Sequence, residues 1–169
     1  MAVSGLADAQ FERILALDPG WNTGWASWVD SDPVKQGVIR GGLMGFKEWV
    51  ESVGPETDTL VIEDFIVEPS FVGQPYASEV KGAAIMSIPH KKLVIQKRAD
   101  KATLFRENGK VATETRRFQR LREWGFSGVS HELDANTHAI IYRKRLRDPV
   151  VLARYFGIGT EATNEEAPE

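Results

Sequence analysis

Short apolar runs closed by turn residues dominate the first part of the chain. Residues 14–17, Ile-Leu-Ala-Leu, lead directly into Asp18, Pro19 and Gly20. Such a run is typical of a strand that is buried on both faces and ends at a turn. Two further runs follow at hairpin distance, so we expect an antiparallel meander of three strands, over 13–18, 24–29 and 34–40.

After the meander the apolar spacing changes to a helical period and then returns to a strand. Apolar residues recur every three to four positions over 44–53, which predicts an amphipathic helix. Residues 59–65 then form a second apolar run, which ends in Glu63 and Asp64. A strand that follows a helix most naturally lies parallel to the first strand through a right-handed crossover. The acidic ends of the two strands would then be neighbours.

The second half of the chain is predicted to be mostly helical. We expect a loop over 68–74, a helix over 76–87, a short strand over 93–95, basic helices over 99–106 and 113–124, and a helix from 131 to about 147 with Ser130 as its N-cap. We further expect a flexible leader over 1–12, one folded domain over 13–148 and an acidic, disordered tail over 149–169. These elements predict an α/β fold, with helices flanking a five-stranded mixed sheet.

Composition limits the classes of protein that remain. The chain has no cysteine, which excludes disulfides and cysteine-ligated zinc, and no apolar run approaches the length of a membrane span. We therefore expect a soluble, cytoplasmic protein. The net charge is −3, yet residues 91–147 carry 15 Lys and Arg against six Asp and Glu. This asymmetry suggests a polyanionic partner, although well-solvated basic helix faces would also account for it.

A third acidic position completes a candidate site. In the last predicted helix His131, Asp134 and His138 have the spacing i, i+3 and i+7, so they fall in a stripe about 60° wide. Carboxylates from two parallel strand ends and a helix would form an oxygen-rich cluster suited to Mg²⁺ or Mn²⁺. Two such ions can activate water against a phosphodiester, and the basic segment would bind the nucleic-acid backbone. For Asp18 alone, a simple turn role is equally consistent.

Four motifs resemble the RuvC-type Holliday junction resolvases of the RNase H-like superfamily, particularly their bacteriophage branch. They are Ile14-Leu-Ala-Leu-Asp18-Pro-Gly-Trp-Asn-Thr-Gly24, Leu60-Val-Ile-Glu63, Lys81-Gly-Ala-Ala-Ile and His131-Glu-Leu-Asp134-Ala. The motifs occur in the family's order and span most of residues 13–146. The resemblance implies an RNase H-like fold and a homodimer that makes paired cuts in branched DNA, in a bacterial or phage-infected cell.

The resemblance also implies roles for individual residues. Asp18, Glu63, His131 and Asp134 would bind two Mg²⁺ or Mn²⁺ ions, and Lys101 would face the scissile phosphate. DNA contacts would come from Lys81, Lys97, Arg98, Lys101, Arg116 and Arg117, with Phe65 or Phe71 stacking at the junction. The dimer would form through one face of the helix 76–87, made of Ala77, Val80, Ala83, Ala84 and Ser87. Whether Asp64 replaces Glu63, or His138 joins the site, stays open.

Three other functions compete with this hypothesis. A ribonuclease of the same fold would use the same metal chemistry but recognise the 2′-hydroxyls of RNA. A non-catalytic DNA-binding protein would need the basic segment but not three converging carboxylates. The sugar kinase and actin superfamily has a phosphate loop like the segment Asp18 to Gly24, but it pairs two such domains, and 169 residues hold only one. No small-molecule cofactor is expected.

Overall fold

The structure, a computed structural model, describes residues 11–64, 75–107 and 109–159. Its first half contains β1 (Arg13–Asp18), β2 (Asn22–Val29), β3 (Asp32–Arg40), α1 (Gly42–Val53), β4 (Thr59–Asp64) and α2 (Tyr76–Ser87). Its second half contains β5 (Lys92–Lys97), the 3₁₀ helix η1 (Arg98–Thr103), β6 (Arg106–Glu107), β7 (Lys110–Val111), α3 (Glu114–Glu123), α4 (Ser130–Arg145) and α5 (Pro149–Phe156).

The main sheet has five strands in the order β3-β2-β1-β4-β5. Strands β1, β2 and β3 pair antiparallel, whereas β4 pairs parallel to β1 and β5 pairs parallel to β4. The expected meander followed by parallel strands is therefore confirmed, and with it the five-stranded mixed sheet of an RNase H-like fold. The chain passes through helix α1 between β3 and β4, and β4 then lies parallel beside β1. This is the arrangement expected of a strand that follows a helix.

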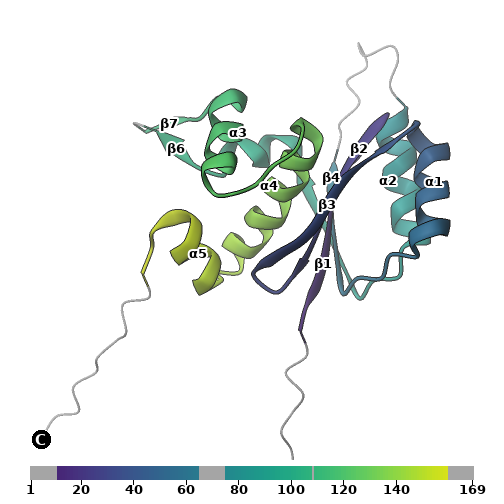
Figure 1. The fold of residues 1–169 in the computed structure, drawn as a ribbon, viewed down its shortest axis with the longest axis horizontal. Coiled ribbons are helices and arrows are strands. Elements are labelled where there is room, and N and C mark those ends of the chain that lie inside the picture. Colours follow the sequence, from purple (N-terminus) through teal and green to yellow (C-terminus); the bar gives the residue numbers. More distant parts are fainter. Residues whose placement is uncertain (1–10, 65–74, 108, 160–169) are drawn as a thin grey trace, which may run out of the picture.

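Helices cover the two faces of this sheet, as Figure 1 shows. Helices α1 and α2 pack on one face over Leu15, Leu17 and Ile62, with Phe46 of α1 fully buried between them. Helix α4 packs on the other face, over a core that also takes in α5. Successive strand residues point to opposite faces, so the parity of a residue decides which core it enters.

Helix α4 is the most deeply enclosed helix among the described residues. Eleven consecutive residues from Leu133 to Arg143 are buried. Its polar residues are buried because they have partners: the Asn136 side chain accepts from Trp28 Nε1 at 2.9 Å and donates to Gln36 Oε1 at 2.7 Å. This enclosure fixes α4 against the sheet, and with it the side chains that α4 presents to the ends of β1 and β4.

Three expectations from the sequence are wrong in the second half. Ser130 is not the N-cap of α4 but its first residue, and Val129 is the N-cap. The segment 99–106 is not a basic helix, since a 3₁₀ helix ends at Thr103 and the short hairpin of β6 and β7 follows. Residues 149–156 are not part of a disordered tail but form α5, with Pro149 in its first turn and Asp148 as its N-cap. Val151 and Tyr155 of α5 are buried, so the folded unit extends beyond residue 148.

Helix α2 does not present the face that we expected to form a dimer. Val80 and Ala84 pack into the chain's own core and Ala77 is also buried, so these three residues are not available to a partner. The large apolar side chains exposed on α2 and on the edge strand β5 are instead Met86, Leu93 and Ile95. Among the described residues, no helix is long and apolar enough to cross a membrane.

Candidate active site

Asp18 and Glu63 meet because β1 and β4 run parallel in register. Leu17 lies beside Ile62, so the next residues, Asp18 and Glu63, end the two strands side by side. Both carboxylates point to the sheet face that α4 covers, and both are buried. Asp64 points to the opposite face, where its carboxylate lies 2.5 Å from Lys81 Nζ. The structure therefore selects Glu63 over Asp64.

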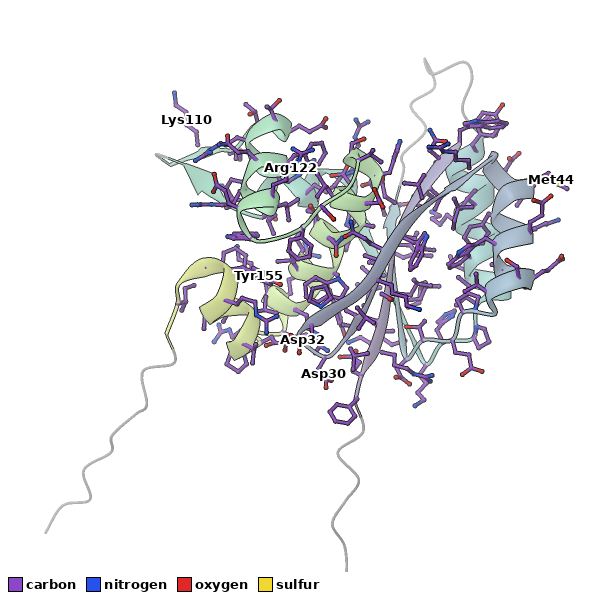
Figure 2. The ribbon with its side chains drawn as sticks, in the orientation of Figure 1. Asp30, Asp32, Met44, Lys110, Arg122 and Tyr155 are labelled. Carbon is purple, nitrogen blue, oxygen red and sulfur yellow. The ribbon has the colours of Figure 1, made fainter. Side chains whose placement is uncertain are left out.

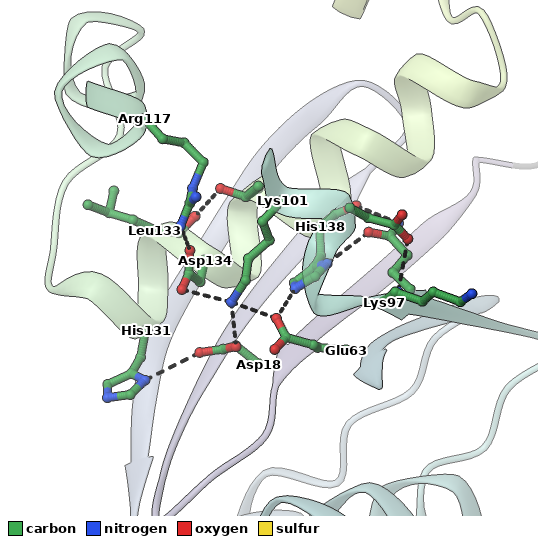
Figure 3. A network of polar contacts seen from close by, with 12 residues as sticks. Asp18, Glu63, Lys97, Lys101, Arg117, His131, Leu133, Asp134 and His138 are labelled. Atoms are coloured by element: carbon green, nitrogen blue, oxygen red, sulfur yellow. Dashed lines mark hydrogen bonds and ion pairs between the residues drawn. The ribbon is translucent and has the colours of Figure 1, made fainter. Parts of the chain in front are cut away.

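Helix α4 brings the third acid and two imidazoles to the same place. His131 Nδ1 lies 3.3 Å from an oxygen of Asp18, and His138 Nε2 lies 2.8 Å from an oxygen of Glu63. Asp134 lies between them on the same helical face (Figure 3). The predicted stripe of His131, Asp134 and His138 is thus confirmed, and His138, which the sequence left open, belongs to the cluster.

Lys101 of η1 occupies the centre of the three carboxylates. Its Nζ lies 2.5 Å from Glu63, 2.9 Å from Asp134 and 3.2 Å from Asp18. Figure 3 shows these contacts meeting at the one ammonium group. The lysine side chain is itself buried, with 8% of its surface exposed. The three carboxylates therefore form a buried site that stabilises a positive charge.

The electrostatics of the cluster keep its charges in place. Burial raises the pKa of Asp18, but the hydrogen bond with His131 and the charge of Lys101 outweigh burial and hold that pKa at about 2. Burial lowers the pKa of Lys101, yet the three carboxylates raise it above its ordinary value. The hydrogen bond with Asp18 raises the pKa of His131. At neutral pH the centre therefore holds an ionised Asp18 beside a protonated Lys101.

Arg117 has a different position from the one expected of a DNA contact. It is buried, and its guanidinium donates to Asp134 Oδ1 at 2.8 Å. Because Oδ1 is held by Arg117, Oδ2 of the same carboxylate is directed at Lys101. The Nε of Arg117 is buried with no hydrogen-bond partner. Arg117 therefore orients a site carboxylate rather than facing solvent, which corrects its assignment as a surface residue that contacts DNA.

Gln96 belongs to the site although the sequence did not point to it. It stands next to Glu63 in the pairing of β4 with β5, and it is fully buried. Its side-chain amide contacts both the Nδ1 and the backbone carbonyl of His138, at 2.8 and 3.0 Å. The available signal was a polar residue at an inward position of the strand, beside the predicted acidic residue on β4.

The carboxylates lie at the inner end of an open cleft of about 490 Å³. The turn between β1 and β2 forms one wall, and η1 with the start of α3 forms another. His131 stands in this cleft with 39% of its side chain exposed, whereas Asp18 has 12% exposed. The cleft is lined by Asp18, Pro19, Gly20, Trp21, Asn22, Glu63, Arg98, Lys101, Glu114, Ser130, His131 and Asp134.

The remaining predicted DNA contacts lie in several places. Arg98 lines the cleft, whereas Lys97 is exposed at the end of β5, in register with Asp64, and does not line the cleft. Arg116 is partly exposed on α3, with its guanidinium 3.5 Å from Glu123. Lys81 pairs with Asp64 on the other face of the sheet and is not brought to the cleft. Phe65 and Phe71 lie outside the described residues.

Basic side chains also stand beyond the cleft. Figure 2 shows Lys110 at the tip of the β6–β7 hairpin and Arg122 on α3, at the end of the molecule opposite Met44 of α1. Both cationic residues are exposed. The basic segment predicted from the sequence thus has exposed cationic residues on α3 and on the β6–β7 hairpin as well.

The residues present fit a divalent cation. Asp18, Glu63 and His138 each offer a ligand atom, and these atoms lie within 4.8 Å of one another. Asp134 and His131 are not in this group, although Asp134 contacts the same Lys101 ammonium and His131 contacts Asp18. Three carboxylates stand against the charges of Lys101 and Arg117, which leaves a negative excess that a divalent cation would offset. Oxygen donors with few nitrogens are the set that Mg²⁺ and Mn²⁺ prefer.

Comparisons with known proteins agree on the fold. No family model matches this sequence, and no curated protein matches it either. A structure of T. thermophilus RuvC in complex with a Holliday junction substrate has a TM-score of 0.57 and 13% identity, covering 80% of this chain and 95% of that one. A second Thermus thermophilus RuvC structure has a TM-score of 0.51 and 14% identity, covering 80% and 96%. The RuvC-type resemblance is thus confirmed at the level of the fold: this chain has the RNase H-like fold of RuvC.

Proposed function

We propose that this protein is a metal-dependent endonuclease that cuts branched DNA, with the four-way junction as its main substrate. One observation carries the proposal: the carboxylates of Asp18, Glu63 and Asp134 converge on a single buried cation within a RuvC-type fold. A protein that only binds DNA has no use for that arrangement. Among other functions of the fold, the geometry best suits hydrolysis of a phosphodiester.

The three carboxylates would hold Mg²⁺ or Mn²⁺, two ions in each site. When bound, these ions supply an activated water and stabilise the charge on the phosphate oxygens. Arg117 keeps Asp134 Oδ2 directed inward, and the β1–β4 pairing keeps Asp18 beside Glu63. The donors are therefore held by main-chain pairing and by a buried ion pair, so little reorganisation is needed when cations bind.

Lys101 and His131 would act on the substrate side of the carboxylates. Lys101 belongs to a 3₁₀ turn that lines the cleft, so a cation among the carboxylates would drive its ammonium toward the open side, where a phosphate would enter. His131 is half exposed at the same opening and hydrogen-bonds Asp18. An imidazole there can bind a metal, or orient a water and accept its proton.

Branched DNA is the substrate that the surroundings of the cleft support. Arg98 lines the cleft, and exposed basic residues continue over α3 and the hairpin. Phosphate contacts of this kind give affinity for any nucleic acid, so they do not choose the substrate. The choice of a four-way junction rests on the likeness to a RuvC fold that was solved with a Holliday junction substrate.

A junction is resolved by two symmetric cuts, which requires two copies of the site. We therefore propose a homodimer with a twofold axis. Since Ala77, Val80 and Ala84 are buried within the subunit, the contact would use the exposed apolar residues of α2 and β5 instead, Met86, Leu93 and Ile95. These side chains are 86%, 39% and 42% exposed, and β5 is an edge strand of the sheet.

Cleavage of defined substrates tests the proposal. A synthetic four-way junction, a linear duplex of the same sequence and an RNA–DNA hybrid are incubated with the protein in Mg²⁺, in Mn²⁺ and in EDTA. We expect metal-dependent, paired cuts in the junction and little cutting of the duplex. Faster cleavage of the RNA strand of the hybrid would favour the ribonuclease alternative, and the absence of any cleavage would reject the proposal.

A further inference from the structure

The side chain of Gln96 fixes which ring nitrogen of His138 carries a proton. The amide Nε2 of Gln96 donates to the backbone carbonyl of His138 at 3.0 Å, and this contact sets the orientation of the amide. Its Oε1 therefore faces His138 Nδ1, at 2.8 Å. A carbonyl oxygen only accepts hydrogen bonds, so Nδ1 must donate. In the neutral imidazole the lone pair then belongs to Nε2.

That lone pair points at another acceptor. Nε2 of His138 lies 2.8 Å from Glu63 Oε2, and these side chains are 0% and 5% exposed. Because the His138 side chain is fully buried, water does not separate the two acceptor atoms. A nitrogen lone pair and a carboxylate oxygen repel each other at this distance unless a positive charge lies between them. Either a second ring proton or a metal ion meets this need. Lys101 Nζ already contacts the same oxygen of Glu63, at 2.5 Å, so this oxygen already interacts with a positive charge.

We propose that His138 is an inner nitrogen ligand of the metal centre, beside Asp18 and Glu63. The inference rests on the proposed function, since it requires that these carboxylates hold a divalent ion. The donor atoms lie within 4.8 Å of one another. In an octahedral shell with bonds of about 2.1 Å, neighbouring donors are about 3 Å apart and opposite donors about 4.2 Å apart. The 2.8 Å between His138 Nε2 and Glu63 Oε2 suits neighbouring donors. Asp18 offers a further oxygen within 4.8 Å of both atoms.

The consequence is a preference among metals. Mg²⁺ favours oxygen ligands and keeps much of its water, whereas imidazole nitrogen suits first-row transition ions. A centre with a fixed nitrogen donor at its inner end, and a second imidazole on the outer side at His131, therefore favours Mn²⁺ over Mg²⁺ more than a site of carboxylates alone would. Gln96 would act as the positioning residue, since it holds the ring tautomer that leaves Nε2 free to bind.

Electron spin echo spectroscopy of bound Mn²⁺ tests this ligand directly, because it detects nitrogen bonded to the ion. The protein carries the substitution His131→Gln and ¹⁵N-labelled histidine, which leaves His90 and His138 as labelled residues. His90 contacts the carbonyl of Ile88 and is not part of the cluster. We expect a ¹⁵N coupling from one directly bound histidine. Since His131 is half exposed, this variant should keep its fold.

Two further measurements, together with the spectrum of the His131→Gln protein, separate the possible outcomes. In Gln96→Met the nitrogen coupling should persist while the affinity for Mn²⁺, from calorimetry, falls about ten- to a hundredfold, as for other partners of metal ligands. Mn²⁺ that binds to the His131→Gln protein without any histidine coupling would overturn the role of His138 and leave the carboxylate centre standing. A wild-type protein with no more affinity for Mn²⁺ than its Asp18→Asn variant would reject the metal centre, and with it the proposed function.

Discussion

Asp18 and Gly24 face each other across β1 and β2, and this pairing determines how closely α4 approaches the site. A Cβ atom on Gly24 would lie 1.9 Å from the backbone carbonyl oxygen of His131. The main chain of α4 therefore contacts the sheet at a strand residue that has no side chain. This contact allows His131 to reach Asp18 and places Asp134 over the strand ends.

Substitution of Gly24 should therefore move the α4 residues of the site, His131 and Asp134, away from Asp18 at the end of β1. Gly24→Ala should displace the start of α4, destabilise the fold by about 1–3 kcal/mol and reduce cleavage by about a hundredfold, because small misplacements have large effects on rate. Gly82→Ala is the matched control, since no atom lies within 4 Å of a Cβ at Gly82. Junction cleavage and urea unfolding measure both effects. Equal activity in the two variants would contradict the role of Gly24.

The pH dependence of stability should reveal the contact between His131 and Asp18. The pKa of His131 is raised in the folded state by its hydrogen bond with Asp18. Its contribution to stability is therefore fully present below the unfolded pKa, about 6.5, and is lost as pH rises through the folded pKa. In EDTA, the free energy of unfolding of the wild type minus that of His131→Gln should fall as pH rises above about 6.5. A difference that grows with pH would contradict this assignment.

DNA affinity should depend on salt and on the residues at the edge of the cleft. Arg98→Ala should weaken junction binding and lower the slope of log affinity against log salt by about 1, because Arg98 lines the cleft. Lys81→Ala should leave both almost unchanged, because Lys81 pairs with Asp64 on the other face of the sheet. Fluorescence anisotropy over a salt series in Ca²⁺ measures the slopes. An effect of Lys81 equal to that of Arg98 would place the DNA elsewhere.

Dimerisation should depend on the exposed apolar residues of α2 and β5. Met86→Arg combined with Leu93→Arg should give a monomer that still nicks junctions but no longer makes paired cuts. Met44→Arg is the control, since Met44 is also exposed, at 64%, but lies on α1. Sedimentation at micromolar concentration checks the result. A wild type that remains a monomer with and without junction DNA would reject the homodimer.

The residues of the site that lie at regular positions could be predicted from the sequence. Asp18 and Glu63 end apolar runs, and strand pairing alone puts such residues at one edge of a sheet. Asp134 and the two histidines follow from helical spacing. Glu63 is selected over Asp64 by the alternation of strand faces, but the choice needed the register, which only the paired strands supply.

The other features depend on packing between distant segments. Arg117 was expected among the DNA contacts that the resemblance implies, but α3 turns this residue inward to Asp134. Lys101 lies on a 3₁₀ turn and not on the expected helix, and this turn directs its ammonium into the cluster. Residues 149–169 were predicted to be disordered because the end of this segment is acidic. The helical spacing of the apolar residues Val151 and Tyr155 in α5 was not considered.

The substitution of two adjacent acids tests the central claim most directly. Glu63 and Asp64 are neighbours on β4, yet only Glu63 faces Lys101 and the cleft, while Asp64 pairs with Lys81 behind the sheet. With Mg²⁺ or Mn²⁺, Glu63→Gln should lower the rate of junction cleavage by at least about a thousandfold, since a metal's stabilisation of the reaction is worth several kcal/mol. Asp64→Asn should cut within about threefold of the wild type, since that side chain points away from the reacting phosphate. Equal loss in both variants, or full cleavage by Glu63→Gln, would contradict a metal-dependent nuclease centred on Asp18, Glu63 and Asp134.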